Sequence, residues 1–205
     1  MESIEIKRFL DMDDHIGQAY QSLRKNIRLY GPEMKIIGFT GCNQDDEISS
    51  VILNMAAVLA KESKKISVII SYIDRLSISS MVLDQQVEDL SCLTSTDTTA
   101  ENIYQTDIEN LYIVLYDAAL SNASETAGMK KLSTLIQELN KACHYVLVDI
   151  PSLDAFGVTE TLKVCDGIVL AVKANTVSFK SARKAKMKLE LSGCPILGAV
   201  LLQDA

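Results

Sequence analysis

The sequence lacks the features of a membrane-spanning or secreted chain. No apolar run approaches the ~20 residues that a transmembrane helix needs. Residues 1–15 have neither the basic start nor the uninterrupted apolar stretch of a signal peptide. We therefore expect a cytoplasmic protein.

The cysteines lack the spacing of a metal site or a disulfide framework. There are five of them, and none falls in a CxxC or Cys/His pattern. We expect all of them to behave as small buried hydrophobic residues. They are Cys42, Cys92, Cys143, Cys165 and Cys194.

The sequence also lacks an excess of positive charge, because 27 Asp and Glu residues outnumber 20 Lys and Arg residues and give a formal net charge of −7. A surface of that sign offers no general electrostatic attraction for nucleic acid, so we expect no nucleic-acid partner. The exception is the basic run KSARKAKMK at residues 180–188. Such a run can meet an acidic partner or an anionic membrane, but more often it is the solvated face of a helix.

What the sequence does contain is a regular alternation of strand and helix patterns. Runs rich in Val, Ile and Leu with little polar alternation suit strands buried on both faces of a parallel sheet. They cover residues 36–40, 66–71, 111–115, 145–149, 167–172 and 196–202. Helical stripes lie between them, at residues 48–59 and 132–143. The order predicts an α/β fold: a doubly wound, mainly parallel sheet flanked by helices in three layers.

The length of 205 residues and the hydrophobic content of 48% suit a single domain covering residues 1–205. We expect an N-terminal helix at about residues 16–29, ended by Gly31 and Pro32, and an α/β core at about residues 34–202. Residues 73–107 mix short polar and apolar pieces, which predicts brief helices and loops.

Ligands of doubly wound folds bind beyond the carboxyl ends of the strands, which directs attention to the loops after Thr40, Ser71 and Asp149. The segment HYVLVDIPS (144–152) brings Asp149 to that edge of the sheet. P-loop enzymes use an aspartate in this place to hold magnesium, directly or through water. The alternative is that Asp149 caps a neighbouring helix or loop.

The order of several segments resembles the cytoplasmic bacterial tyrosine kinases of capsular and exopolysaccharide synthesis. These segments are AYQSLRKNI (19–27), NMAAVLAKESKKISVII (54–70), HYVLVDIPS (144–152) and the stretch from CDGIVLAVK to LGAVLL (165–202). The chain is more distantly similar to the cell-division and plasmid-partition ATPases of the same P-loop class. The resemblance implies a P-loop fold, ATP and Mg²⁺ as cofactors, and a membrane-bound activator or co-polymerase as partner. It also implies self-association through the helix at residues 18–28.

The chain departs from this family in its first nucleotide motif. The family's glycine-rich loop ends in Gly-Lys-Ser/Thr-Thr, and the matching stretch here is TGCNQDDEISS (40–50). Glu47 replaces the last glycine and Ile48 the lysine that would neutralise the β- and γ-phosphates. Ser49 keeps the hydroxyl that would bind magnesium together with Asp149. The vestigial loop comprises Gly41, Asn43, Asp45, Asp46, Glu47, Ile48, Ser49 and Ser50.

Three consecutive acids, Asp45, Asp46 and Glu47, replace the glycines that would let backbone N–H groups surround a phosphate. We expect them to repel ATP. They can instead fill the anion site at the helix N-terminus themselves, with Ile48 packed inward. Another alternative is that these acids and Asp149 bind a divalent cation without nucleotide.

Three hypotheses about function follow. The first is a catalytically degenerate relative of the tyrosine kinases that acts as a regulatory or scaffolding protein in polysaccharide synthesis, with no cofactor and no confident catalytic residue beyond a vestigial Asp149. It would lie in the cytoplasm, at the inner face of the membrane through its partner. The second is an active kinase or ATPase with a non-standard P-loop that uses ATP and Mg²⁺. The third is a protein that positions or partitions unrelated cargo.

Overall fold

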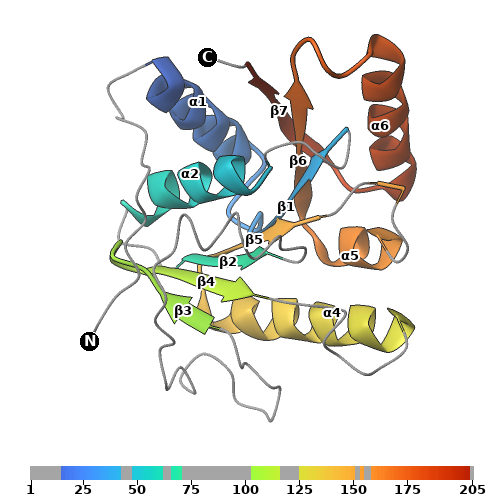
Figure 1. The fold of residues 1–205 in the computed structure, drawn as a ribbon. Helices are drawn as coiled ribbons and strands as arrows, with labels where there is room; N and C mark the ends of the chain where they lie inside the picture. The colour runs from blue at the N-terminus through green and yellow to red at the C-terminus, as the bar shows by residue number, and fades with distance from the viewer. Residues whose placement is uncertain are drawn as a thin grey trace.

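The computed structural model describes residues 15–42, 48–61, 66–70, 103–115, 125–150, 153–154 and 158–203. Within these ranges the strands form one seven-stranded sheet in the order β3-β4-β2-β5-β1-β6-β7 (Figure 1). All neighbouring strands pair in parallel except β3 and β4, which are antiparallel. The strands are β1 (Ile36–Gly41), β2 (Ile66–Ile70), β3 (Ile103–Gln105), β4 (Leu111–Leu115), β5 (Tyr145–Asp149), β6 (Gly167–Lys173) and β7 (Ile196–Leu202).

Helices cover both faces of this sheet. The helices are α1 (His15–Leu29), α2 (Ile48–Ala60), α4 (Glu125–Ala142), α5 (Val158–Val164) and α6 (Phe179–Ser192). Figure 1 shows α1 and α2 on one side and α4, α5 and α6 on the other. The structure therefore confirms the predicted doubly wound, three-layer α/β fold. No helix in the described part of the chain is long and apolar enough to cross a bilayer.

The central strands are apolar on both sides because each of their faces meets a separate hydrophobic core. In β5, Leu147 joins the core formed with α1 and α2, whereas Val146 and Val148 join the core formed with α4, α5 and α6. In β1, Ile37 and Phe39 belong to the first core and are fully buried. This double burial explains why these strands appear in the sequence as continuous apolar runs.

The starts of β1 and β6 are joined by a side chain. The Asp166 carboxylate accepts hydrogen bonds from the backbone N–H groups of Lys35 at 2.9 Å and Ile36 at 2.7 Å. These donors lie where β1 begins, and Asp166 itself lies just before β6. The contact therefore fixes the alignment of two neighbouring strands at their amino-terminal ends, opposite the carboxyl ends where the predicted site lies.

Most predicted elements are confirmed, including the N-terminal helix and the six predicted strands, which correspond to β1, β2, β4, β5, β6 and β7. The prediction of only helices and loops for residues 73–107 is wrong at β3 (Ile103–Gln105), a short strand created by antiparallel pairing with β4. Residues 71–102 lie outside the described residues. The cysteine prediction holds for Cys143, Cys165 and Cys194, which are buried. Cys42 is half-buried and Cys92 lies outside the described ranges.

Candidate functional site

The candidate site lies where β1 and β5 end side by side in the middle of the sheet. Their register pairs Phe39 with Asp149, so the last residue of β5 lies next to the end of β1. The chain leaves β1 toward α2 on one face of the sheet and leaves β5 toward α5 on the other. Where the connections after two neighbouring strands go to opposite faces of the sheet, a crevice forms between them, and doubly wound folds bind their ligands in it.

Ser49 and Asp149 meet in this crevice, as the sequence predicts for a pair that could hold magnesium. The Ser49 hydroxyl, in the first turn of α2, donates to Oδ2 of Asp149 across 3.4 Å. That distance is long for an O–H···O bond, so the contact is a weak one. The two side chains are 100 residues apart in the sequence, and the sheet brings them together.

Asp149 is buried, with only 8% of the residue exposed. Burial raises its pKa from 3.8 to about 7, because a charged carboxylate loses its hydration there, and the Ser49 hydrogen bond opposes this shift. The group therefore takes up a proton close to neutral pH. A cation in contact with it would favour the ionised form instead.

Ile48, which is predicted to stand in place of the P-loop lysine, has its side chain in the core. It is 7% exposed and belongs to the cluster formed by α1, α2 and the sheet. The prediction that Ile48 packs inward is confirmed. No cationic group can reach a phosphate from this position in the chain.

The other predicted loop residues are only partly described. Gly41 is buried at the end of β1, and Ser50 is half-buried on α2. Asn43, Asp45, Asp46 and Glu47 lie outside the described residues, so their predicted roles stay predictions.

Within the described ranges, no group of three or more His, Cys, Asp or Glu side chains is placed to hold a metal ion. Ser49 and Asp149 alone supply two protein oxygens. Magnesium prefers six oxygen ligands and commonly takes most of them from water and from the phosphates of its substrate. The described residues therefore fit a magnesium ion that arrives with a nucleotide better than one held by the protein alone.

One residue that shapes this region received no role in the sequence analysis. A Cβ on Gly38, in the middle of β1, would lie 2.6 Å from Cδ1 of Ile168 and closer still to Ile150. A larger residue there would require the Ile150 and Ile168 side chains to move, so the absence of a Cβ on Gly38 lets both side chains pack directly against β1. A glycine inside a buried strand was the signal for this close approach.

Comparison with known proteins finds sequence similarity to bacterial tyrosine kinases and a fold shared with several solved structures. No model of a known protein family matches the chain. The chain is 26% identical over 210 residues to the tyrosine-protein kinase CpsD of Streptococcus pneumoniae serotype 4, covering 98% of this chain and 90% of that protein.

Two solved structures share the fold. The chimerical protein CapA2B2 is similar with a TM-score of 0.75 and 20% identity, over 97% of this chain and 92% of that one. The septum site-determining protein MinD of Pyrococcus horikoshii, complexed with Mg-ADP, is similar with a TM-score of 0.61 and 20% identity. That match covers 82% of this chain and 69% of MinD.

Proposed function

We propose that this chain, a homologue of the bacterial tyrosine kinases, acts as a regulatory or scaffolding protein in capsular or exopolysaccharide synthesis and does not transfer phosphate. The observation that carries the proposal is the burial of Ile48 at the lysine position. Phosphoryl transfer spreads negative charge over the γ-phosphate, and a positioned cation lowers the energy of that state. An isoleucine in the core supplies no such charge.

The state of Asp149 supports the same conclusion. Because its pKa is raised to about 7, part of the carboxyl population stays protonated and uncharged near neutral pH without a metal ion. The three acids of residues 45–47 add negative charge to the loop that a polyphosphate would approach.

The proposed partner is a membrane-bound polysaccharide co-polymerase or activator protein, which would hold this chain at the inner face of the membrane. Self-association would use the helix at residues 18–28. Tyr20, Leu23 and Ile27 of α1 pack into the core, so the opposite face, which includes Gln18 and Lys25, is exposed and available to a second copy.

A nucleotide-binding experiment tests the proposal. The full chain is titrated with ATP and Mg²⁺ while its melting temperature is followed, and then incubated with radiolabelled ATP. We expect no change in melting temperature and no label on the protein. The matched control is the Glu47→Gly, Ile48→Lys double variant, which restores the glycine and the lysine and should gain affinity for ATP. Label transfer by the unaltered chain would overturn the proposal.

The second candidate is an active kinase or ATPase with a non-standard P-loop, using ATP and Mg²⁺. The contact between Ser49 and Asp149 favours it, because the two magnesium-binding groups of a P-loop are kept in mutual reach. The same experiment decides between the two candidates. The third hypothesis, a positioning or partition protein, draws on the fold shared with MinD. Capture of partition or division machinery without any polysaccharide protein would favour it.

A further inference from the structure

Helix α6 concentrates positive charge on a chain that is negative overall. It carries five basic side chains and one acidic one, whereas the whole chain has a formal charge of −7. Its two ends are firmly capped: the Ser178 hydroxyl accepts from the backbone N–H of Ser181, and Gly193 ends the helix in the left-handed conformation. Ala185 and Leu189 are buried against the sheet. The opposite side of α6 is therefore held outward on a well-formed helix.

That outward side exposes large apolar side chains. Phe179, Arg183, Met187 and Leu191 follow one another at intervals of four residues, so they line a single stripe along the helix. Phe179 and Leu191 are each 84% exposed and Met187 is 52% exposed. We call these four residues the α6 stripe. Exposing three large apolar side chains to water on one short helix is unfavourable, and covering them would lower the free energy.

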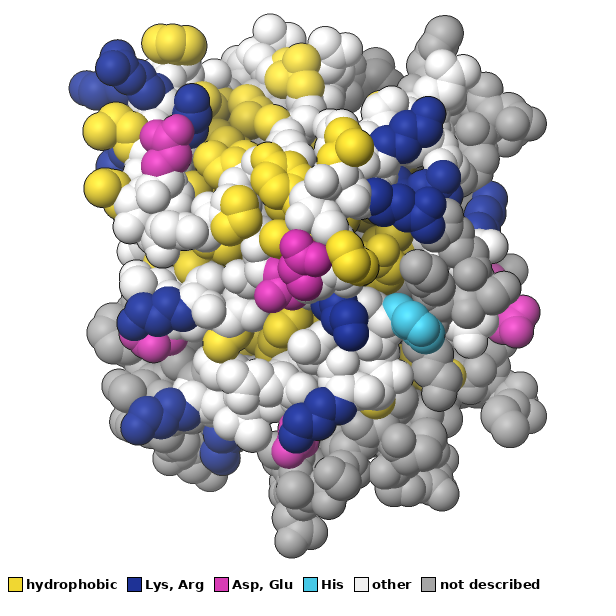
Figure 2. Space-filling model, turned by 180° about the vertical axis from the view of Figure 1, so that it is seen from behind, with side chains coloured by type: hydrophobic (Ala, Val, Ile, Leu, Met, Phe, Trp, Pro, Cys, Tyr) yellow, Lys and Arg dark blue, Asp and Glu magenta, His cyan; other side chains and the backbone are white. Residues whose placement is uncertain are grey.

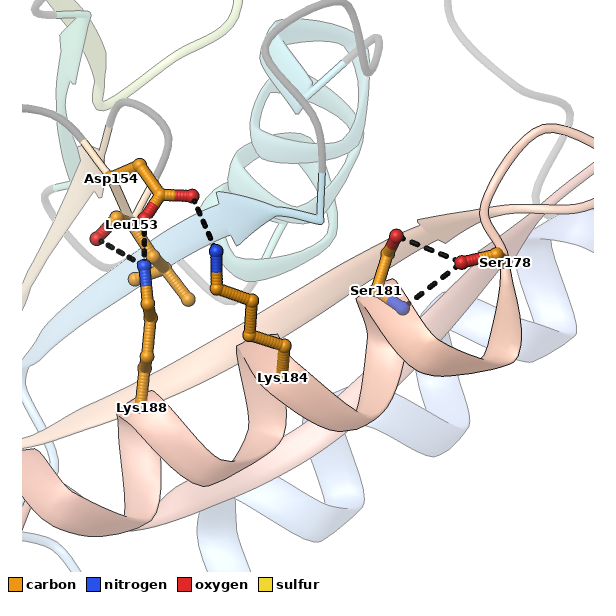
Figure 3. A network of polar contacts seen from close by, with 6 residues as sticks. All are labelled: Leu153, Asp154, Ser178, Ser181, Lys184 and Lys188. Carbon is orange, nitrogen blue, oxygen red and sulfur yellow. Dashed lines mark hydrogen bonds and ion pairs between the residues drawn. The ribbon is translucent and has the colours of Figure 1, made fainter.

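Lysines flank the α6 stripe on both sides. Lys184 forms an ion pair with Asp154 at 3.4 Å, and Lys188 contacts the same carboxylate (Figure 3). Lys186 pairs with Glu190 at 3.5 Å. Lys180 and Arg183 have no ion-pair partner among the residues that the structure describes.

The apolar surface continues from the stripe onto the neighbouring edge of the sheet. Phe179 and Arg183 border a depression of about 780 Å³ between α6 and β7, whose floor includes Leu170 and Ile196. Leu201 of β7 is 61% exposed. Figure 2 shows hydrophobic side chains gathered in the upper part of this face, with Lys and Arg side chains at its upper left, on the side where α6 lies.

We propose that the α6 stripe and its flanking lysines bind directly to an anionic membrane surface. Lys and Arg clusters on a helix are attracted to anionic headgroups, and exposed Phe and Leu side chains insert at the boundary between headgroups and acyl chains. Four of the five basic residues of α6 are lysines, which are depleted from protein–protein interfaces but suit a lipid surface. The inference goes beyond the proposed function, because it requires neither a nucleotide nor a membrane-bound partner.

A fluorescent reporter makes this binding measurable, since the chain contains no tryptophan. In the Phe179→Trp variant of the full chain, the single tryptophan lies on the α6 stripe. Vesicles of phosphatidylcholine with about 30 mol % phosphatidylglycerol should shift its emission to shorter wavelength, and pure phosphatidylcholine vesicles should not. The Leu29→Trp variant places the reporter on α1, where Leu29 is 83% exposed, and should show no shift.

Vesicle flotation measures the affinity. Raising the salt from about 0.1 M to about 1 M shortens the Debye length from ~10 Å to ~3 Å and should release the protein. The Lys180→Glu, Arg183→Glu variant should bind at least about tenfold more weakly. The Lys130→Glu, Lys131→Glu variant changes net charge equally but on exposed residues of α4, and should bind like the unaltered chain. Circular dichroism and melting curves confirm that each variant is folded.

Several results would overturn the proposal. One is equal binding of the protein to anionic and neutral vesicles, and another is binding to neither. Equal loss in the α4 and α6 variants would show that net charge rather than this face is responsible. Binding to polyglutamate or duplex DNA without binding to vesicles would reassign the face to an acidic macromolecule. The vesicle experiments contain no ATP, so their outcome does not depend on whether the chain transfers phosphate.

Discussion

Replacing Asp149 with asparagine should stabilise the protein, and the gain should grow as the pH rises. In the folded state the pKa of this carboxyl is about 7, above its ordinary value of 3.8. The folded state therefore binds more protons than the unfolded state between these two values. Since stability falls with rising pH wherever the folded state binds more protons, Asp149 destabilises the protein increasingly from about pH 4 to about pH 7.

The magnitude follows from the size of the shift. A rise of about three pKa units, at ~1.4 kcal/mol for each unit, gives a cost on the order of 4 kcal/mol once the carboxyl is ionised in both states. At about pH 5 the cost is only ~1.5 kcal/mol, because the folded state still keeps its proton there. Asparagine never ionises, so the difference between variant and parent should widen by ~2.5 kcal/mol from about pH 5 to about pH 8.

Urea unfolding of both proteins at several pH values provides the measurement, without added metal. The matched control is Asp154→Asn in the loop that follows β5. The lysines of α6 lower the pKa of Asp154, so its contribution to stability is lost as the pH falls, which is the opposite direction. A difference between Asp149→Asn and the parent that stays constant across this range would refute the reasoning. Added Mg²⁺ that removes the difference at about pH 8 would show that a cation binds Asp149.

Three further predictions concern the stability of the fold. Gly38→Ala should destabilise the protein by about 1–3 kcal/mol, because the new methyl group overlaps Ile150 and Ile168. Thermal denaturation measures this loss of stability, and an unchanged melting temperature would contradict the prediction. Ile48→Ala should cost about 2–4 kcal/mol in urea unfolding, as expected of a core residue; a cost near zero would mean that the side chain is not buried. Asp166→Ala removes the acceptor for two N–H groups at the start of β1 and should cost about 1–3 kcal/mol, with faster hydrogen exchange there. Unchanged exchange would show that this contact contributes little.

The sequence was most informative where burial is uniform. Strands covered on both faces are apolar at nearly every position, so β1, β5 and most of β6 could be located closely from their composition. It failed at β3, whose three residues form a strand only because β4 lies beside them. A pairing of this kind depends on a distant segment and leaves no local pattern.

For the candidate site, the sequence by itself determined the residue type at each position: Ile48 where the resemblance predicts a lysine, acids at residues 45–47 where it predicts glycines, and a serine and an aspartate at Ser49 and Asp149. Only the tertiary structure decided that Ser49 and Asp149 meet, that Asp149 is buried enough to hold its proton near neutral pH, and that Ile48 is part of the core. It also decided that the basic run of α6 shares its outer face with exposed Phe179 and Leu191. The physical reason is that residue type is local, whereas proximity, hydration and exposure depend on which segments the sheet order brings together.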